Sequence, residues 1–338
     1  MKSFLFRSCR LVALLLLLIS MLSNSEVSQA DENNLSPEQV RQLMTKTFDV
    51  MQENYIEPEV VPELRELFLN KLELGQYDSL TSLDDFAHVL GQDLRAVTGD
   101  NHLSLYTVNP DEEITHILTH EEGKLTNNYG FEEVRYLSGN IGYLKFNKFS
   151  PDKQARDAVD AAFNFLEQSD GIIIDLRDTV GGSPDLVQYM LSYFLPDETP
   201  LWYVVNSKSE KTAEISASDT AAHQGFRGDF PVWILTSRNT ASASEIFAGV
   251  LQANSKAVLV GDITASAGFY VGVRRITDTL AFRISLFKPI ITATEKNWER
   301  TGIIPDIEVP AMDALNHAHE LSSKTTRAGL YSEPASFR

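Results

Sequence analysis

The sequence predicts an α/β protein in which a mostly parallel sheet follows a small helical region. From about residue 140 onward, short apolar runs typical of buried strands alternate with stretches that have the apolar period of a helix. Repeated strand and helix units of this kind build a mostly parallel sheet with right-handed crossovers. Residues 36–100, in contrast, contain only helical patterns. These two observations together set the fold class.

The first residues of the chain have the features of a secretory signal peptide. Lys2, Arg7 and Arg10 supply positive charge, residues 11–21 are apolar, and small residues end at Ala30. The apolar run is too short to span a bilayer comfortably. We therefore expect residues 1–30 to be removed after Ala30, which predicts a periplasmic or secreted protein without a membrane span after signal removal. A retained membrane anchor is the less favoured alternative.

Charge and cysteine content exclude several classes of function. The formal net charge of −18 at pH 7 argues against nucleic acid and anionic membranes as partners. The only cysteine, Cys9, lies in the predicted signal, so the mature chain is predicted to lack disulfides and cysteine-based metal sites. His116 and His120 have helical spacing, but no glutamate follows His116 as it does in zinc proteases. We predict no cofactor and no metal.

The remaining chain divides into four predicted regions. A helical N-terminal domain covers residues 31–107, with helices starting at the Ser36–Gln39 capping box and covering 61–74 and 83–97. Residues 108–140 are a connecting segment, 141–310 the α/β core, and 311–338 a tail with one short helix over 312–321. The polar residues 206–229 suggest a mobile flap within the core.

A serine stands at a predicted turn between a strand and a helix. Residues 232–235 are apolar, residues 240–245 read T-A-S-A-S-E, and residues 246–251 start an apolar helical pattern. A hydroxyl at such a helix start lies near the positive end of the helix dipole, where an oxyanion is stabilised. Ser242 is therefore the candidate nucleophile. A helix start of small residues packed on a sheet would give the same pattern.

A second strand end carries a pair of glycines. The buried-strand pattern of residues 171–177 is followed by Gly181 and Gly182, and then by Ser183 and Pro184. Glycines allow a positive φ and expose backbone N–H groups to a ligand. Serine and proline are favoured at the first positions of a helix. An ordinary turn from strand to helix would look the same.

Together these segments resemble the C-terminal processing (tail-specific) protease family and its relatives, the interphotoreceptor retinoid-binding proteins and tricorn-type proteases. The family pattern has Asp-Leu-Arg, Gly-Gly, Ala-Ser-Ala-Ser-Glu and Trp-Glu-Gly-x-Gly-x-x-Pro-Asp in that order. Here these elements stand at residues 175–177, 181–182, 241–245 and 298–306, the last reading W-E-R-T-G-I-I-P-D. The resemblance extends over residues 36–310. It implies a ClpP/crotonase-like spiral β/α core.

Two departures from the pattern place the chain near the retinoid-binding-protein-like branch. Residues 107–140 are too few for the PDZ domain of many processing proteases, which needs about 80–100 residues. The lysine base of those proteases corresponds to Ala267 here, within an otherwise recognisable turn. Alanine cannot accept a proton, so a serine–lysine dyad is excluded at this position. Lys256 and Lys288 do not match the pattern either.

The resemblance implies a histidine base instead. Asp100 and His102 are similar to the Asp-x-His-(Leu/Thr)-Ser pattern of the retinoid-binding-protein-like and tricorn-type members. Histidine is suited to act as base and then as acid at neutral pH. Glu299 matches a glutamate that orients the histidine in tricorn-type sites, although Asn101 stands where tricorn has serine. A loop histidine at a domain joint and a surface glutamate are the alternatives.

The resemblance therefore implies a serine-type endopeptidase of the tail-specific protease superfamily that acts on a peptide or protein substrate. Its oxyanion hole would use the N–H groups of Gly181 or Gly182 and of Ala243. The alternative is a weak or inactive binding protein that uses the same cleft for an apolar ligand or a peptide. The missing lysine favours this alternative, whereas the retained serine, glycine pair, histidine and glutamate favour catalysis. The oligomeric state stays unknown.

Overall fold

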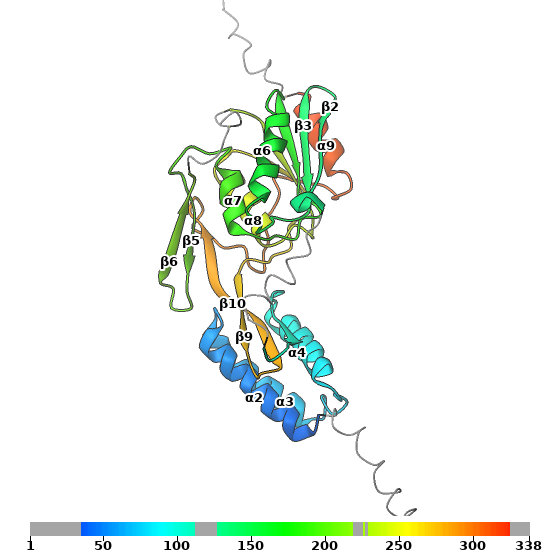
Figure 1. Cartoon of the computed structure of the whole chain (residues 1–338), viewed down its shortest axis with the longest axis vertical. Coiled ribbons are helices and arrows are strands. Elements are labelled where there is room, and N and C mark those ends of the chain that lie inside the picture. Colours follow the sequence, from blue (N-terminus) through cyan, green and yellow to red (C-terminus); the bar gives the residue numbers. More distant parts are fainter. Residues whose placement is uncertain (1–34, 112–126, 219–225, 227–228, 325–338) are drawn as a thin grey trace, which may run out of the picture.

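The computed structural model describes residues 35–111, 127–218, 226 and 229–324. The predicted signal peptide, the pair His116 and His120, and the last residues of the tail lie outside these ranges. The described chain forms two sheets with helices around them (Figure 1). None of the helices in these ranges is long and apolar enough to cross a membrane.

The six-stranded sheet lies in the upper half of Figure 1. Its strand order is β11 (Ile307–Glu308), β8 (Val258–Gly261), β7 (Val232–Thr236), β4 (Gly171–Asp175), β3 (Ile141–Phe146) and β2 (Phe131–Leu137). Neighbouring strands from β11 to β3 are parallel, and β2 pairs antiparallel with β3. The carboxyl ends of the parallel strands therefore meet at one edge, where the turns after β4 and β7 lie close together.

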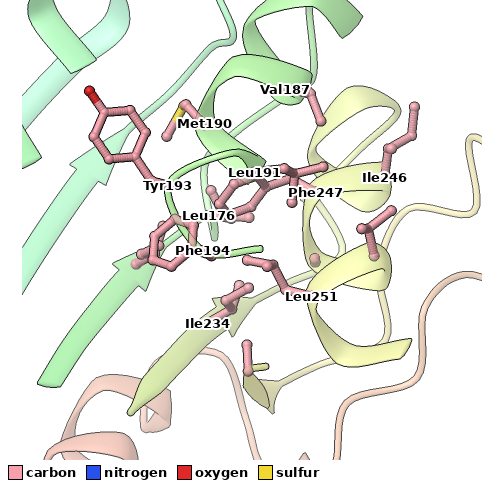
Figure 2. Packing of buried hydrophobic residues seen from close by; sticks show 14 of the residues in the cluster. Leu176, Val187, Met190, Leu191, Tyr193, Phe194, Ile234, Ile246, Phe247 and Leu251 are labelled. Carbon is pink, nitrogen blue, oxygen red and sulfur yellow. The ribbon is translucent and has the colours of Figure 1, made fainter. Parts of the chain in front are cut away.

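Helices cover both faces of this sheet. The helices α6 (Ala155–Phe165), α7 (Pro184–Leu191) and α8 (Ala243–Ala253) share one core, and α9 (Ala314–Ser322) packs on the other face. Along β4, Ile172 and Ile174 belong to the first core and Ile173 to the second. Figure 2 shows Phe247 and Leu251 of α8 beside α7 and β7. Burial on both faces explains why these strands read as continuous apolar runs.

The second sheet has five strands. They are β1 (Ser104–Thr107), β5 (Pro200–Val205), β6 (Lys211–Ser216), β9 (Tyr270–Arg275) and β10 (Leu280–Ile291). The first part of β10 pairs with β1 and β9, and its last four residues pair with β5. This long strand runs from the α/β core down to the N-terminal helices (Figure 1).

The N-terminal helices pack on this second sheet. They are α2 (Pro37–Asn54), α3 (Val61–Glu73) and α4 (Leu83–Thr98), with the short η1 (Pro58–Val60) between α2 and α3. Phe48, Phe86 and Leu90 of the helices share a core with Phe282 and Ile284 of β10. The helical region therefore does not stand apart from the rest, since strands from late in the chain complete its core.

The predicted fold class is confirmed, and so are the predicted helices. The capping box at Ser36 is present, α4 ends at Gly99 in a left-handed conformation, and the tail helix is α9. Several strands were missed. Strand β2 lies in the segment predicted as a connection, and β6 lies in the segment predicted as a flap. Both are edge strands with many exposed residues, so their apolar signal is weak.

Candidate active site

Ser242 lies at the sharp turn between β7 and α8. Its backbone has φ 55° and ψ −118°, a conformation that costs free energy for any residue other than glycine. The surroundings hold this turn in place, because the Glu245 carboxylate accepts the Ser242 N–H at 2.8 Å and the Thr179 carbonyl accepts the Ala241 N–H at 3.1 Å. A serine on a strained turn from strand to helix is typical of a nucleophile elbow.

The Glu245 carboxylate also holds the loop that follows β8. It is completely buried and accepts hydrogen bonds from Thr264 Oγ1 at 2.5 Å, from the Ser266 N–H at 2.9 Å and from the Ala267 N–H at 2.9 Å. Burial raises the pKa of this carboxyl, and the hydrogen bonds oppose that effect only in part. One side chain thus fixes Ala267, at the position of the family lysine, beside the turn of Ser242.

The two glycines after β4 approach the serine turn closely. Gly181 has φ 104°, and a Cβ there would lie 2.9 Å from Ser242 Cβ and 3.2 Å from the Ala243 nitrogen. Gly182 has φ 130°, and a Cβ there would lie 2.0 Å from the Phe149 carbonyl oxygen. Only glycine fits at either position. Within the described part of the chain, no hydrogen bond uses the N–H of Gly181, Gly182 or Ala243.

One cleft of about 890 Å³ contains all of the predicted site residues except Glu299 in its wall. Its wall includes Asn101, His102, Lys148, Gly181, Gly182, Ser242, Ala243, Ala267, Tyr270 and Phe287. His102 comes from the turn after α4, whereas Ser242 and the glycines come from the α/β core. The cleft therefore lies where the N-terminal region meets the core.

His102 is held by Asp100, which the sequence interpretation did not select as a functional residue. Asp100 is completely buried; its Oδ1 accepts the His102 N–H at 2.9 Å and lies 3.4 Å from His102 Nδ1. Its Oδ2 accepts the Tyr55 hydroxyl at 3.2 Å. Burial alone would raise the pKa of Asp100, but hydrogen bonds and charge from His102 outweigh it and keep the pKa below its usual value.

Asp100 is therefore ionised at neutral pH on the Nδ1 side of the imidazole. His102 Nδ1 has no hydrogen-bond partner among the described residues, so Asp100 acts on the ring through its charge at this separation. A carboxylate this close favours the tautomer that carries its proton on Nδ1 and leaves Nε2 free to accept one, and it stabilises the imidazolium that forms. The signal for this role was present in the sequence as the Asp-x-His spacing. The motif pattern instead indicated Glu299 for the supporting role.

Glu299 lies near this pair but not among the residues of the cleft wall. Its Oε2 accepts the Gly268 N–H at 2.6 Å, and its buried Oε1 has no hydrogen-bond partner in the described ranges. Burial raises the pKa of Glu299 to about 8, and the charge of Asp100 adds to the effect. Glu299 is thus mostly protonated at neutral pH. Its catalytic role stays a prediction, in which it would act as a neutral carboxyl.

Three lysines are relevant because Ala267 stands where the resemblance implied a lysine base. Lys256 donates to the Phe230 carbonyl at 2.9 Å, and burial lowers its pKa to about 8, but it is not part of the cleft wall. Lys288 lines a different hollow, beside β5 and β6. Lys148 lines the cleft itself, although no sequence motif points to it. It is the lysine against which His102 has to be tested.

We expect the stability of the protein to fall as pH rises from about 4.5 to about 8, and we expect Glu299→Gln to weaken this dependence. The glutamate ionises near 4.5 in the unfolded chain and near 8 in the folded one. Between these values the folded state binds one proton more, so rising pH favours unfolding. Urea unfolding midpoints across this pH range measure the effect.

The control for this measurement is Glu53→Gln, since Glu53 is an exposed residue of α2. This variant should follow the wild-type pH dependence. An identical slope for the wild type and both variants would contradict a buried, protonated Glu299.

Protein-family comparisons match most of the described chain in two consecutive segments. Residues 140–309 match Peptidase family S41, and residues 35–134 match the N-terminal domain of Peptidase S41 in eukaryotic IRBP. A carboxyl-terminal-processing protease of Synechocystis sp. is 31% identical over 168 residues, which are 49% of this chain and 37% of that protein. The matched part thus spans well under half of that relative.

Solved structures with similar folds cover both the helical region and the core. A lipoprotein from Streptococcus agalactiae has a TM-score of 0.58 and 16% identity, covering 85% of this chain and 96% of that one. A photosystem II D1 C-terminal processing protease has a TM-score of 0.53 and 14% identity, covering 80% of this chain and 93% of that one. At such identities the likeness concerns the fold alone.

Proposed function

Because the chain belongs to peptidase family S41, we propose that it is a serine-type peptidase with Ser242 as its nucleophile. The family resemblance inferred from the motifs is confirmed by the matches over both regions. The observation that carries the proposal is the shared cleft, whose wall contains Ser242, His102 and the glycine pair. We also propose action in the periplasm or outside the cell, because residues 1–30 have the features of a signal peptide.

In the proposed reaction, His102 removes the hydroxyl proton of Ser242 as Oγ attacks the carbonyl carbon of the scissile bond. The Asp100 carboxylate stabilises the imidazolium that results. The oxyanion of the tetrahedral intermediate accepts hydrogen bonds from the Ala243 N–H and from Gly181 or Gly182. The imidazolium then returns its proton to the leaving amine, and water releases the acyl group from the serine by the same steps in reverse.

The substrate proposal is a peptide with an apolar side chain near the scissile bond. A hollow of about 390 Å³ adjoins the cleft and shares Pro184, Tyr270 and Phe287 with it. Trp202, Val204 and Ile215 supply more of its wall. Burying a leucine or phenylalanine side chain there would stabilise the complex by about 1.5–3 kcal/mol. Asp185 also lines this hollow, so the preference is expected to be strongest against acidic side chains.

We expect the protein to cleave peptides with Leu or Phe near the scissile bond roughly 10–100-fold faster than matched peptides with Asp, which corresponds to the burial energy above. The measurement is kcat/KM for a set of peptides that differ at one position, with products identified by mass spectrometry. The Ser242→Ala variant should form no product. Equal product formation by this variant would mean that the activity has another source.

One observation favours a second candidate, a binding protein for an apolar ligand. Ala267 stands in place of the family lysine, and the adjoining hollow is largely apolar. Saturable binding of a fatty acid that quenches Trp202 fluorescence, together with no cleavage of any peptide, would favour this candidate. Cleavage that depends on Ser242 would exclude it as the main function.

A further inference from the structure

Arg300 occupies a glycine position of the family pattern while keeping a backbone conformation that favours glycine. The pattern Trp-Glu-Gly-x-Gly stands here as Trp298, Glu299, Arg300, Thr301 and Gly302. Arg300 has φ 61°, a left-handed value that costs free energy for a residue with a Cβ. A strained residue of this kind persists where its surroundings gain something from it.

The Arg300 side chain binds the ends of two N-terminal helices. Its Nη1 and Nη2 donate to Glu57 Oε1 at 3.1 Å and to Oε2 at 2.6 Å, a bidentate pair just after α2. Its Nε donates to the Thr98 carbonyl at 2.8 Å, at the end of α4. The Arg300 backbone N–H donates to the Ser266 carbonyl at 3.2 Å, in the loop after β8. One residue thus joins the N-terminal region to the core loop.

We call the contacts of Arg300 with Glu57, Thr98 and Ser266 the clamp. Its N-terminal contacts lie next to the Asp100–His102 turn. The Asp100 N–H donates to Thr98 Oγ1 at 3.1 Å, and the Tyr55 hydroxyl donates to Asp100 Oδ2 at 3.2 Å. Arg300 binds Thr98, which precedes Asp100 by two residues. It also binds Glu57, which follows Tyr55, the hydrogen-bond donor to Asp100, by two residues. Gly99 faces the guanidinium, since a Cβ there would lie 3.5 Å from Arg300 Nε.

The core contact of the clamp leads to the serine turn. The Ser266 N–H donates to the Glu245 carboxylate, which also accepts the Ser242 N–H. A continuous set of hydrogen bonds therefore runs from the Asp100–His102 turn through Arg300 and Glu245 to Ser242.

The exposure of the ion pair points to positioning more than to stability. The Arg300 and Glu57 side chains are 41% and 21% exposed. Ion pairs with such exposure contribute little to the free energy of unfolding. The helices are attached to β10 by a buried apolar core in any case. Loss of the clamp should thus free the turn without unfolding the protein.

We propose that Arg300 is a positioning residue that holds the Asp100–His102 turn against the core and so sets the place of His102 relative to Ser242. It replaces a glycine that would fit the backbone better, which makes this device specific to chains that carry the arginine. The consequence for rate rests on the proposed serine–histidine mechanism. The consequence for the mobility of the turn does not.

The test restores the family glycine with Arg300→Gly. We expect the rate of serine labelling by a fluorophosphonate probe to fall by about 10–100-fold, the effect of a small misplacement of a reacting group. The melting temperature should not fall, because glycine relieves the backbone strain. Arg300→Lys keeps the charge but loses the bidentate geometry, so its rate should lie between those of the wild type and Arg300→Gly.

A matched pair of variants separates the effect of losing the contact with Arg300 from the effect of losing one negative charge. Glu57→Gln weakens the pair with Arg300 and should slow labelling. Glu63→Gln makes the same charge change on the wall of the same surface hollow, where no contact with Arg300 is found among the described residues, and should label at the wild-type rate. Equal loss in both variants would overturn the proposal.

Hydrogen exchange separates this proposal from the proposed function. In Arg300→Gly, amides of residues 99–104 should exchange at least tenfold faster than in the wild type, a change that needs no catalysis. Unchanged exchange there overturns the positioning role, even if the wild type is an active peptidase. If exchange is faster in Arg300→Gly but the wild type never reacts with the probe, the positioning role of Arg300 is supported and the peptidase function is rejected.

Discussion

Replacing Ser242 with alanine is expected to abolish labelling by a fluorophosphonate probe and to lower peptide hydrolysis by more than about a thousandfold. The reason is chemical, because alanine has no hydroxyl to attack the carbonyl carbon. The fold should survive, since the Glu245 carboxylate binds the backbone N–H at this position and not the side chain. Gel fluorescence after labelling and kcat/KM on one peptide measure the two effects.

Ser244→Ala is the matched control for this prediction. Ser244 lies two positions along in the same motif, but it is buried and its hydroxyl donates to the Thr179 carbonyl at 3.1 Å. This variant should keep its labelling at Ser242. Labelling that persists in Ser242→Ala, or a label found on Ser244, would reject Ser242 as the nucleophile.

Asp100→Asn is expected to lower kcat by roughly 10³–10⁴-fold and His102→Ala to remove activity, with the serine and the glycines left in place. Asparagine removes the charge that stabilises the imidazolium and permits the wrong tautomer. The pKa of Asp100 is held below its usual value, so this carboxyl is ionised at neutral pH and supplies the charge that asparagine lacks.

The controls for the base are His88→Ala and Lys148→Ala. His88 is an exposed residue of α4, and its replacement should leave kcat unchanged. Lys148 lines the cleft, so it is the rival base. A rate that rises only above about pH 9, as for a lysine with little pKa depression, and that is lost in Lys148→Ala would replace His102 in the mechanism.

Helix caps and apolar runs in the sequence predicted the helices and strands whose formation depends on neighbouring residues. The capping box at Ser36 and the glycine at position 99 mark helix ends, because caps satisfy backbone groups of the same few residues. The apolar runs of β3, β4 and β7 were recognised because both faces of these strands are buried. Strands β1, β5 and β6 were missed, since their place depends on pairing partners far along the chain.

The motifs likewise identified candidate residues but not their contacts. Ser242, His102 and the glycine pair were named from the sequence, and all of them line one cleft. The Asp-x-His spacing indicated that Asp100 lies near His102, but the sequence could not reveal that the Asp100 carboxylate is completely buried and hydrogen-bonded to Tyr55. It also could not reveal that Glu299 is buried near this carboxylate, which raises its pKa to about 8.

By itself, the sequence of this protein determined the α/β class, the helical region, the family and the residue types available for chemistry. These follow from apolar periodicity, helix caps and short motifs, all of which are set within a few residues. Only the tertiary structure decided which charges meet. Arg300 pairs with Glu57 across 243 positions because packing of α2 and α4 on the late strand β10 brings these two residues together. Nothing in the local sequence encodes the partner of a side chain at such a separation.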